Sequence, residues 1–286
     1  MRASRPGLSV QGISEGIMEK NPTDERGTTR RGVVVTRAAD IKPQKLVGVW
    51  NGRFHRGKLG LIAGEPGLGK SQVGILMAAT VSTGGEWPCG EGTARRGDVV
   101  YISPEERATD TIRPRLEAAS ADLTRVHIIE EVNHALGARP FSLVTDLGQL
   151  DEVLKTLRKP RLVIIDPINA CLSSADIPFN PNSVTHVRGL FCRLASVAAR
   201  RGVAIVCVTH FTKAKGATIL ARVTGSFAFV AAARSVFTVE RKQDDPNQRV
   251  FAAAKNNLTA DTNPLVFRIE QGGSEIPAPY AVFAAS

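Results

Sequence analysis

The chain has 286 residues, 43% of them hydrophobic, which suffices for one large domain or two small ones and excludes disorder throughout. The formal net charge is +10, of which residues 1–60 contribute +7 and residues 61–286 only +3. No stretch approaches the roughly 18 uninterrupted apolar residues of a membrane span, and the N-terminus lacks an apolar signal core, so we expect a soluble cytoplasmic protein without membrane association.

Residues 1–36 are rich in Ser, Gly, Thr and Arg and show no sustained periodicity. This composition predicts a flexible basic N-terminal arm. Such an arm either attracts nucleic acid or only solubilises the protein, and the sequence leaves both interpretations open. The following segment leads toward the first buried strand, and its Trp50 would either cover a sheet or flank a nucleotide base.

Residues 59–79 have the pattern of a strand, a glycine-rich turn and a helix, which is typical of a P-loop. Backbone N–H groups of such a turn point into one concavity, and the helix N-terminus adds positive potential, so we expect a triphosphate to bind there. Lys70 would reach the β- and γ-phosphates, and the hydroxyl of Ser71 would ligate Mg²⁺. The residues predicted to hold the nucleotide are Gly64, Glu65, Pro66, Gly67, Leu68, Gly69, Lys70, Ser71 and Gln72.

Beyond the P-loop, strand and helix patterns alternate as far as residue 210. The predicted strands are 98–103, 126–129, 162–166 and 203–210, and the predicted helices are 109–119, 146–158 with Asp146 as N-cap, and 183–201. A short apolar helix over 225–234 and strands over 235–240, 249–254 and 265–269 follow. We therefore predict an α/β domain over residues 37–272, with a mostly parallel central sheet, flanking helices and a C-terminal antiparallel extension. Residues 273–286 would form a tail that is irregular from Ile276 onward.

The four cysteines, Cys89, Cys171, Cys192 and Cys207, are widely separated along the chain. The last three have apolar neighbours, which indicates buried free thiols rather than disulfides or a metal site. This usage of cysteine is typical of a reducing, cytoplasmic environment.

Reactive side chains follow four of the predicted parallel strands, where ligands of such sheets collect. Asp166 ends an apolar strand in which a lone buried carboxylate is costly, so it would hold Mg²⁺ rather than serve structure alone. Glu105 or Glu106 would orient the attacking water, although either could instead be a carboxylate that favours a helix start. His210 would sense the γ-phosphate, or would be a strand-end histidine satisfied by backbone groups.

Four motifs in this order, namely residues 64–71, Tyr101–Glu105, Ile164–Pro167 and Val208–Lys213, resemble the RepA-like ATPases. That family belongs to the RecA-like ring ATPases and includes plasmid-encoded hexameric replicative helicases. The similarity covers roughly residues 40–270 and implies an ATP- and Mg²⁺-dependent ATPase in which Glu105 is the catalytic carboxylate. It also implies a homo-hexameric ring in which Arg234, nine residues after Gly225, completes the neighbouring subunit's ATP site. A local salt bridge is the alternative role of Arg234.

The segment 212–224 corresponds to the loop with which RecA-like rings contact DNA. Its cations Lys213, Lys215 and Arg222 would bind single-stranded DNA, or they would simply be solvated, since few aromatics accompany them. The leading interpretation is a DNA helicase or translocase in replication of a plasmid or mobile element. Three alternatives remain open: a RecA/RadA-like recombination or repair ATPase, a small-molecule P-loop kinase and a nucleotide-switched regulator.

Overall fold

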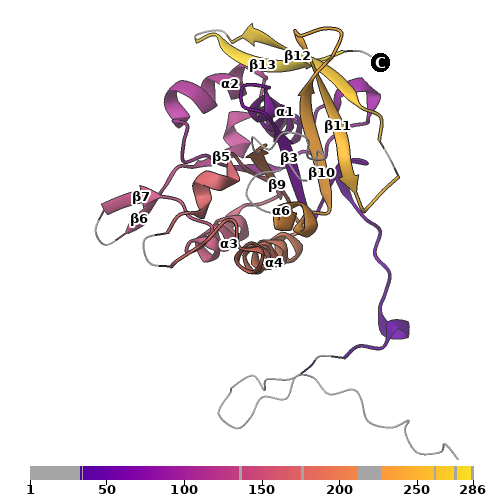
Figure 1. Cartoon of the computed structure of the whole chain (residues 1–286), viewed down its shortest axis with the longest axis vertical. Coiled ribbons are helices and arrows are strands. Elements are labelled where there is room, and N and C mark those ends of the chain that lie inside the picture. Colours follow the sequence, from indigo (N-terminus) through magenta and orange to yellow (C-terminus); the bar gives the residue numbers. More distant parts are fainter. Residues whose placement is uncertain are drawn as a thin grey trace, which may run out of the picture. The chain divides into compact units, whose positions relative to one another are not determined.

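A mixed sheet of nine strands forms the centre of the fold (Figure 1). The computed structural model describes residues 33, 35–134, 137–174, 177–211, 227–260, 262–273 and 276–284, and every structural statement concerns these residues. The chain divides into two units, Met1–Lys45 and Leu46–Ser286. In the first unit, Ala38–Asp40 form a 3₁₀ helix, beside which the exposed Arg37 pairs with Asp40 at 3.1 Å. The sheet belongs to the second unit.

The strand order in the sheet is β13-β12-β11-β10-β3-β9-β8-β4-β5. Neighbouring strands are parallel from β10 to β5, and β10 to β13 form an antiparallel extension. The sheet strands are β3 (Leu59–Gly64), β4 (Asp98–Ile102), β5 (Val126–Ile129), β8 (Pro160–Ile165), β9 (Ala204–His210), β10 (Ser235–Arg241), β11 (Gln248–Asn256), β12 (Leu265–Gly272) and β13 (Ala278–Phe283). The predicted α/β class with an antiparallel extension is therefore confirmed.

Two small antiparallel pairs and several helices surround the sheet. The pairs are β1 (Gly48–Trp50) with β2 (Phe54–His55), and β6 (Glu131–His134) with β7 (Gly137–Pro140). The α-helices are α1 (Lys70–Thr83), α2 (Arg113–Ala118), α3 (Leu147–Thr156), α4 (Val184–Arg201) and α6 (Phe227–Ala232). Shorter helical turns are η2 (Pro88–Gly90), η3 (Ala108–Ile112), η4 (Leu123–Arg125) and η5 (Ile168–Leu172).

Both faces of the parallel strands are buried, which explains their unbroken apolar sequences. Alternate side chains of one strand point to opposite faces. Leu61 and Val163 accordingly pack with α3, α4 and α6, whereas Ile62 and Ile164 pack with α1 and α2. The sheet therefore lies between two layers of helices, and the polar side chains lie at the ends of its strands.

Trp50, the last residue of β1, belongs to a buried cluster of aromatic and charged side chains. Its ring stacks on Trp87 with centroids 4.5 Å apart, and its indole N–H donates to Glu91 at 2.6 Å. The guanidinium of Arg53 has no exposed surface and donates to both carboxylate oxygens of Glu91, at 2.6 and 2.7 Å. Of the two roles expected for Trp50, packing over the sheet is the one that the structure shows.

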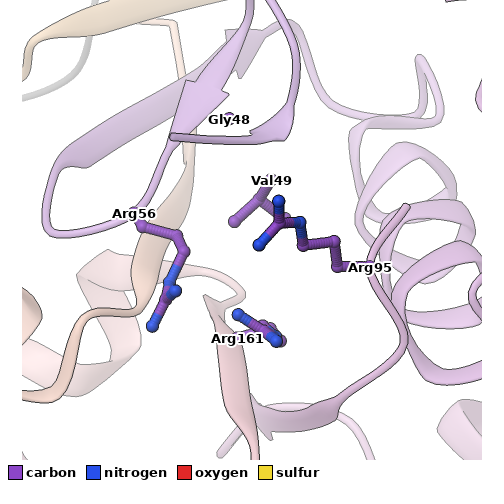
Figure 2. Close-up of a pocket in the computed structure, with 5 residues that line it drawn as sticks. All are labelled: Gly48, Val49, Arg56, Arg95 and Arg161. Atoms are coloured by element: carbon purple, nitrogen blue, oxygen red, sulfur yellow. The ribbon is translucent and has the colours of Figure 1, made fainter. Parts of the chain in front are cut away.

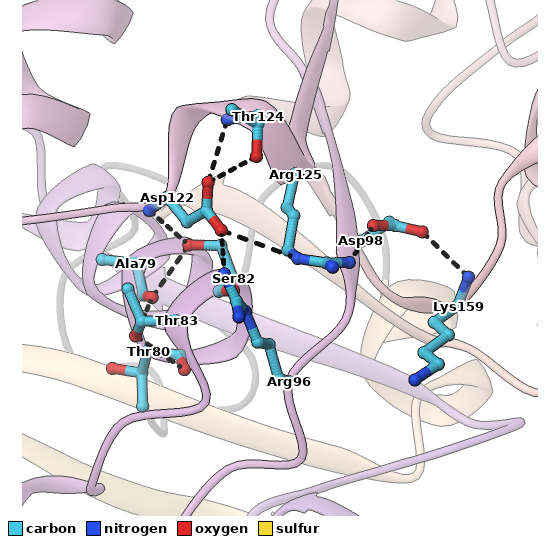
Figure 3. A network of polar contacts seen from close by, with 10 residues as sticks. All are labelled: Ala79, Thr80, Ser82, Thr83, Arg96, Asp98, Asp122, Thr124, Arg125 and Lys159. Carbon is cyan, nitrogen blue, oxygen red and sulfur yellow. Dashed lines mark hydrogen bonds and ion pairs between the residues drawn. The ribbon is translucent and has the colours of Figure 1, made fainter.

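A polar network ties the end of α1 to the beginning of β4 (Figure 3). The backbone N–H of Asp122 donates to the hydroxyl of Ser82 at 3.0 Å, and the Asp122 carboxylate accepts from Arg96 at 2.5 Å. Arg125 donates to Asp98 at 2.9 Å. These contacts fix the amino end of β4 against the helix that follows the P-loop.

Several sequence-based expectations were wrong in detail. Ala278–Phe283 form β13 rather than an irregular tail, because their N–H and C=O groups pair with the edge of β12. All four cysteines are free and Cys171 and Cys207 are buried, but Cys192 is exposed on the outer side of α4. The prediction of Asp146 as the N-cap of α3 is confirmed, although its carboxylate caps no helical N–H and instead accepts from Arg139 and from the backbone of Ser142.

Candidate active site

The turn between β3 and α1 has the geometry of a phosphate cradle. Gly67 and Gly69 have φ values of 75° and 88°, which suit glycine. A Cβ added to Gly67 would meet no atom within 4 Å, so the turn borders open space. No side chain caps the first N–H groups of α1, which are therefore available to an anion. The turn fits the phosphates of a nucleotide.

Lys70 lies at the start of α1 with only 4% of its surface exposed. Its ammonium donates to the carbonyl of Glu65 at 2.7 Å. Burial lowers the pKa of Lys70 to about 8, although Asp166 and Glu65 act in the opposite direction. A phosphate group would restore the electrostatic stabilisation that the ammonium loses on burial.

Asp166 follows β8 and is 5% exposed. Its carboxylate accepts a hydrogen bond from the hydroxyl of Tyr101 at 2.8 Å and another from Ser71. Burial raises the pKa of Asp166, while the bonds from Tyr101 and Ser71 oppose the rise. Ser71 and Asp166 are therefore in contact, as the predicted Mg²⁺ site requires, and both present oxygen ligands of the kind that Mg²⁺ prefers. No cluster of three or more His, Cys, Asp and Glu side chains suited to a metal exists within the described ranges.

Two consecutive glutamates follow β4, and the structure distinguishes them. Glu106 is half-buried and accepts from Arg115 at 2.7 and 2.8 Å. Glu105 is exposed, and no described side chain pairs with it. The ion pair with Arg115 restrains and neutralises Glu106, which leaves Glu105 as the carboxylate that is available to a water molecule.

His210 ends β9 beside the P-loop. It is in register with Gly64, whose carbonyl accepts from the N–H of Phe211 at 3.1 Å. The Nδ1 atom of His210 is buried and has no partner among the described residues. Burial and the nearby Lys70 both lower the pKa of this imidazole, which favours its neutral form. The alternative of a histidine satisfied by backbone groups does not hold for this nitrogen.

Further polar atoms at the same edge are buried without partners among the residues that the structure describes. They are Oε1 of Gln72, Oγ of Ser103 and Oγ1 of Thr209. An unsatisfied buried polar atom costs about 1–3 kcal/mol, so these atoms favour a polar occupant such as a nucleotide with its water.

Arg234 lies at the opposite end of the parallel strands from the P-loop. Its backbone N–H donates to the carbonyl of Leu59, at the amino end of β3, at 2.9 Å. The P-loop follows the carboxyl end of that six-residue strand, roughly 20 Å away at about 3.3 Å per residue. The side chain is exposed, and none of the described carboxylates pairs with it. The structure therefore does not bring Arg234 to the P-loop of its own chain.

The structure brings together the P-loop, Glu105, Asp166 and His210, because β3, β9, β8 and β4 are consecutive in the sheet. The predicted DNA loop with Lys213, Lys215 and Arg222 lies outside the described residues, as does the N-terminal arm as far as residue 32.

Sequence reasoning missed Tyr101 and Arg115. The signal for Tyr101 was a hydroxyl within an apolar strand, since a buried tyrosine O–H requires a partner.

No helix of the described residues is long and apolar enough to cross a membrane.

Comparison with known proteins shows similarity to "DNA repair protein RadA" from several bacteria. The Bacillus subtilis (strain 168) protein is 26% identical over 239 residues, which are 82% of this chain and 44% of the relative. The Aquifex aeolicus (strain VF5) protein is 24% identical over 238 residues, 81% and 45%. The Brucella abortus (strain 2308) protein is 30% identical over 173 residues, 58% and 31%.

The chain thus spans less than half the length of each of these relatives. The family AAA_25, described as an AAA domain, matches residues 24–216, more than half of the chain. This range contains the P-loop, Glu105, Asp166 and His210. The chain therefore belongs to the AAA_25 family of AAA domains, which are RecA-like P-loop ATPases.

Proposed function

We propose that this protein is an Mg²⁺-dependent ATPase that acts on DNA in repair or recombination and works as an oligomer. The hydrolytic part rests on one observation: the P-loop, Asp166 and Glu105 lie at neighbouring strand ends, and no described side chain pairs with Glu105. The DNA-repair part is supported by the names of the relatives.

Each residue has a role that follows from its environment. Lys70 binds the β- and γ-phosphates, exchanging its bond to the Glu65 carbonyl for bonds to phosphate oxygens. Ser71 and Asp166 hold Mg²⁺, which supplies charge neutralisation at the phosphates when it is bound. Glu105 orients the attacking water and accepts its proton, and His210 donates a hydrogen bond to the γ-phosphate.

Arg234 acts on the ATP of a neighbouring copy. Its distance from its own P-loop excludes a direct role within one chain, and its exposure leaves the guanidinium accessible. An arginine delivered to a neighbour's γ-phosphate stabilises the charge that develops during transfer. Hydrolysis would then depend on assembly.

The resemblance to plasmid replicative helicases remains a prediction. The names of the relatives favour repair or recombination over plasmid replication, so we propose a repair or recombination ATPase ahead of a replicative helicase. Both alternatives require DNA contact, for which Lys213, Lys215 and Arg222 remain the proposed residues.

The test is the ATPase rate with and without single-stranded DNA, measured beside the native mass of the protein. We expect DNA to stimulate turnover and the mass to be that of an oligomer, with Lys70→Ala as the inactive control. A monomer that hydrolyses ATP without DNA stimulation would contradict the proposal and favour a kinase or a switched regulator. Electron microscopy with and without DNA would then distinguish a hexameric ring from a filament.

A further inference from the structure

A small pocket at the amino-terminal edge of the sheet is lined by three arginines (Figure 2). Arg56, Arg95 and Arg161 come from three separate segments, and all three line the same pocket. Gly48 and Val49 complete the lining of this shallow pocket, whose enclosed volume is about 10 Å³. The P-loop lies at the other end of the strands, so this pocket is distinct from the nucleotide site.

Local structure holds two of these arginines in place. Arg56 precedes β3, where its Nε donates to the carbonyl of Gly202 at 2.5 Å and its backbone N–H donates to Val47 at 2.9 Å. Arg161 is skipped in the pairing of β4 with β8, in which Asp98 faces Pro160 and Val99 faces Leu162. Such a bulge re-aims a side chain out of the regular alternation of the strand.

Gly97 is part of the same arrangement. A Cβ at position 97 would lie 2.2 Å from Cγ of Arg161 and 2.6 Å from the carbonyl of Lys159. Only glycine therefore leaves room for the Arg161 side chain to lie across the start of β4. The bulge and the glycine together make the position of Arg161 specific.

None of the described carboxylates pairs with Arg56, Arg95 or Arg161. The next residue along the chain, Arg96, forms an ion pair with Asp122 at 2.5 Å, so a carboxylate is present nearby but pairs with a different arginine (Figure 3). Nε of Arg161 is buried without a hydrogen-bond partner among the described residues. Burial lowers the pKa of Arg161, and the charges of Arg56 and Arg95 lower it further. Three like charges therefore line one pocket and have no carboxylate partner among the described residues, an arrangement that a bound anion would stabilise.

We propose that Arg56, Arg95 and Arg161 form a binding site for a phosphate group. The planar guanidinium fork matches phosphate oxygens and forms charge-assisted, often bidentate hydrogen bonds with them. The enclosed volume is far below the roughly 300–1,000 Å³ of ordinary ligand pockets, so the arginines would hold a single phosphate group at the mouth of the pocket and not a whole nucleotide. The phosphate can come from a DNA backbone or from a small phosphate in solution.

The first arm of the test measures binding of inorganic phosphate by calorimetry in a Lys70→Ala background, which removes phosphate binding at the P-loop and any dependence on turnover. Adding Arg95→Gln should weaken phosphate binding by roughly tenfold or more, as expected for a lost charged hydrogen bond. Arg95 is exposed, so this variant should keep its fold, which circular dichroism checks. Arg161→Gln should show the same loss. Arg188→Gln, an exposed arginine on α4, is the matched control and should bind as before.

The second arm uses a fluorescent single-stranded oligonucleotide. If a DNA phosphate is the natural occupant, Arg95→Gln should weaken DNA binding and reduce the slope of log affinity against log salt by about 0.7, whereas Arg188→Gln should not. Loss of phosphate binding with unchanged DNA binding would identify a small phosphate as the occupant.

Unchanged phosphate binding in both Arg95→Gln and Arg161→Gln would overturn the proposal. A change in native mass without a change in phosphate binding would also overturn it, in favour of a carboxylate from a second copy. Neither arm depends on ATP hydrolysis, so failure here is distinguishable from failure of the proposed ATPase function.

Discussion

The backbone N–H of Arg234 donates to the carbonyl of Leu59, so this arginine is fixed at the end of β3 that lies away from the P-loop. We expect Lys70→Ala to lose ATP binding, and Arg234→Ala to bind ATP but hydrolyse it about 10³-fold more slowly. Mixing the two variants should restore part of the turnover, because some interfaces then combine an intact P-loop with an intact Arg234. No recovery at any ratio, with both variants still assembling, would contradict the role between subunits.

Glu105 and Glu106 offer a matched pair of substitutions. Glu105→Gln should retain ATP binding and lose most hydrolysis, on the order of 10²-fold or more, because the water loses its base. Glu106→Gln should keep most of the activity and instead loosen the ion pair with Arg115. Single-turnover hydrolysis and nucleotide binding would be measured for both. The reverse order of activities would assign the catalytic role to Glu106.

Tyr101 positions Asp166, and Tyr101→Phe removes its 2.8 Å hydrogen bond while keeping the ring. We expect the Mg²⁺ concentration for half-maximal ATPase activity to rise about 10- to 100-fold, as for other groups that orient metal ligands. Maximal turnover at saturating Mg²⁺ should change less. Tyr280→Phe is the control, since Tyr280 contacts Glu270 on β12 at 3.3 Å. Equal Mg²⁺ dependence in both variants would exclude the positioning role.

The buried ion pair between Arg53 and Glu91 should contribute to the free energy of unfolding. Glu91→Ala leaves a fully buried guanidinium without its carboxylate, so the free energy of unfolding should fall by about 3–5 kcal/mol in urea denaturation. Glu152→Ala removes an exposed pair with Lys155 and should change stability by less than about 1 kcal/mol. A similar small effect for Glu91→Ala would show that Arg53 reaches water.

The stability that the Asp146 carboxylate contributes should depend on pH. Burial acts to raise its pKa, but Arg139 and the N–H of Ser142 outweigh burial and lower the pKa below its usual value near 4. The carboxylate therefore stabilises the fold above about pH 4, and this contribution disappears as the pH falls through the lowered pKa. Asp146→Asn should cost about 1–3 kcal/mol at pH 7 and progressively less below pH 4. A difference that is independent of pH would contradict this account.

Much of the fold was predictable because the parallel strands carry their own signal. Val163, Ile164 and Ile165 form a β-branched run that is typical of a strand buried on both faces, and the reactive groups that follow parallel strands lie at the same end of the sheet. The strand β13 was not predictable, because Ala278–Phe283 carry no clear alternation and become a strand only by pairing with β12. Cys192 was misplaced because its apolar neighbours on α4 do not reveal which side of the helix faces water.

Local patterns of apolar and glycine residues sufficed to predict the P-loop, the α/β class and the residues that follow the parallel strands. Only the folded structure shows that Arg115 pairs with Glu106, which leaves Glu105 without a side-chain partner among the described residues. It also shows that Tyr101 holds Asp166 and that Arg56, Arg95 and Arg161 line one pocket. These relations join residues distant in sequence, and they follow from strand order, register and a single bulge, which no local pattern encodes.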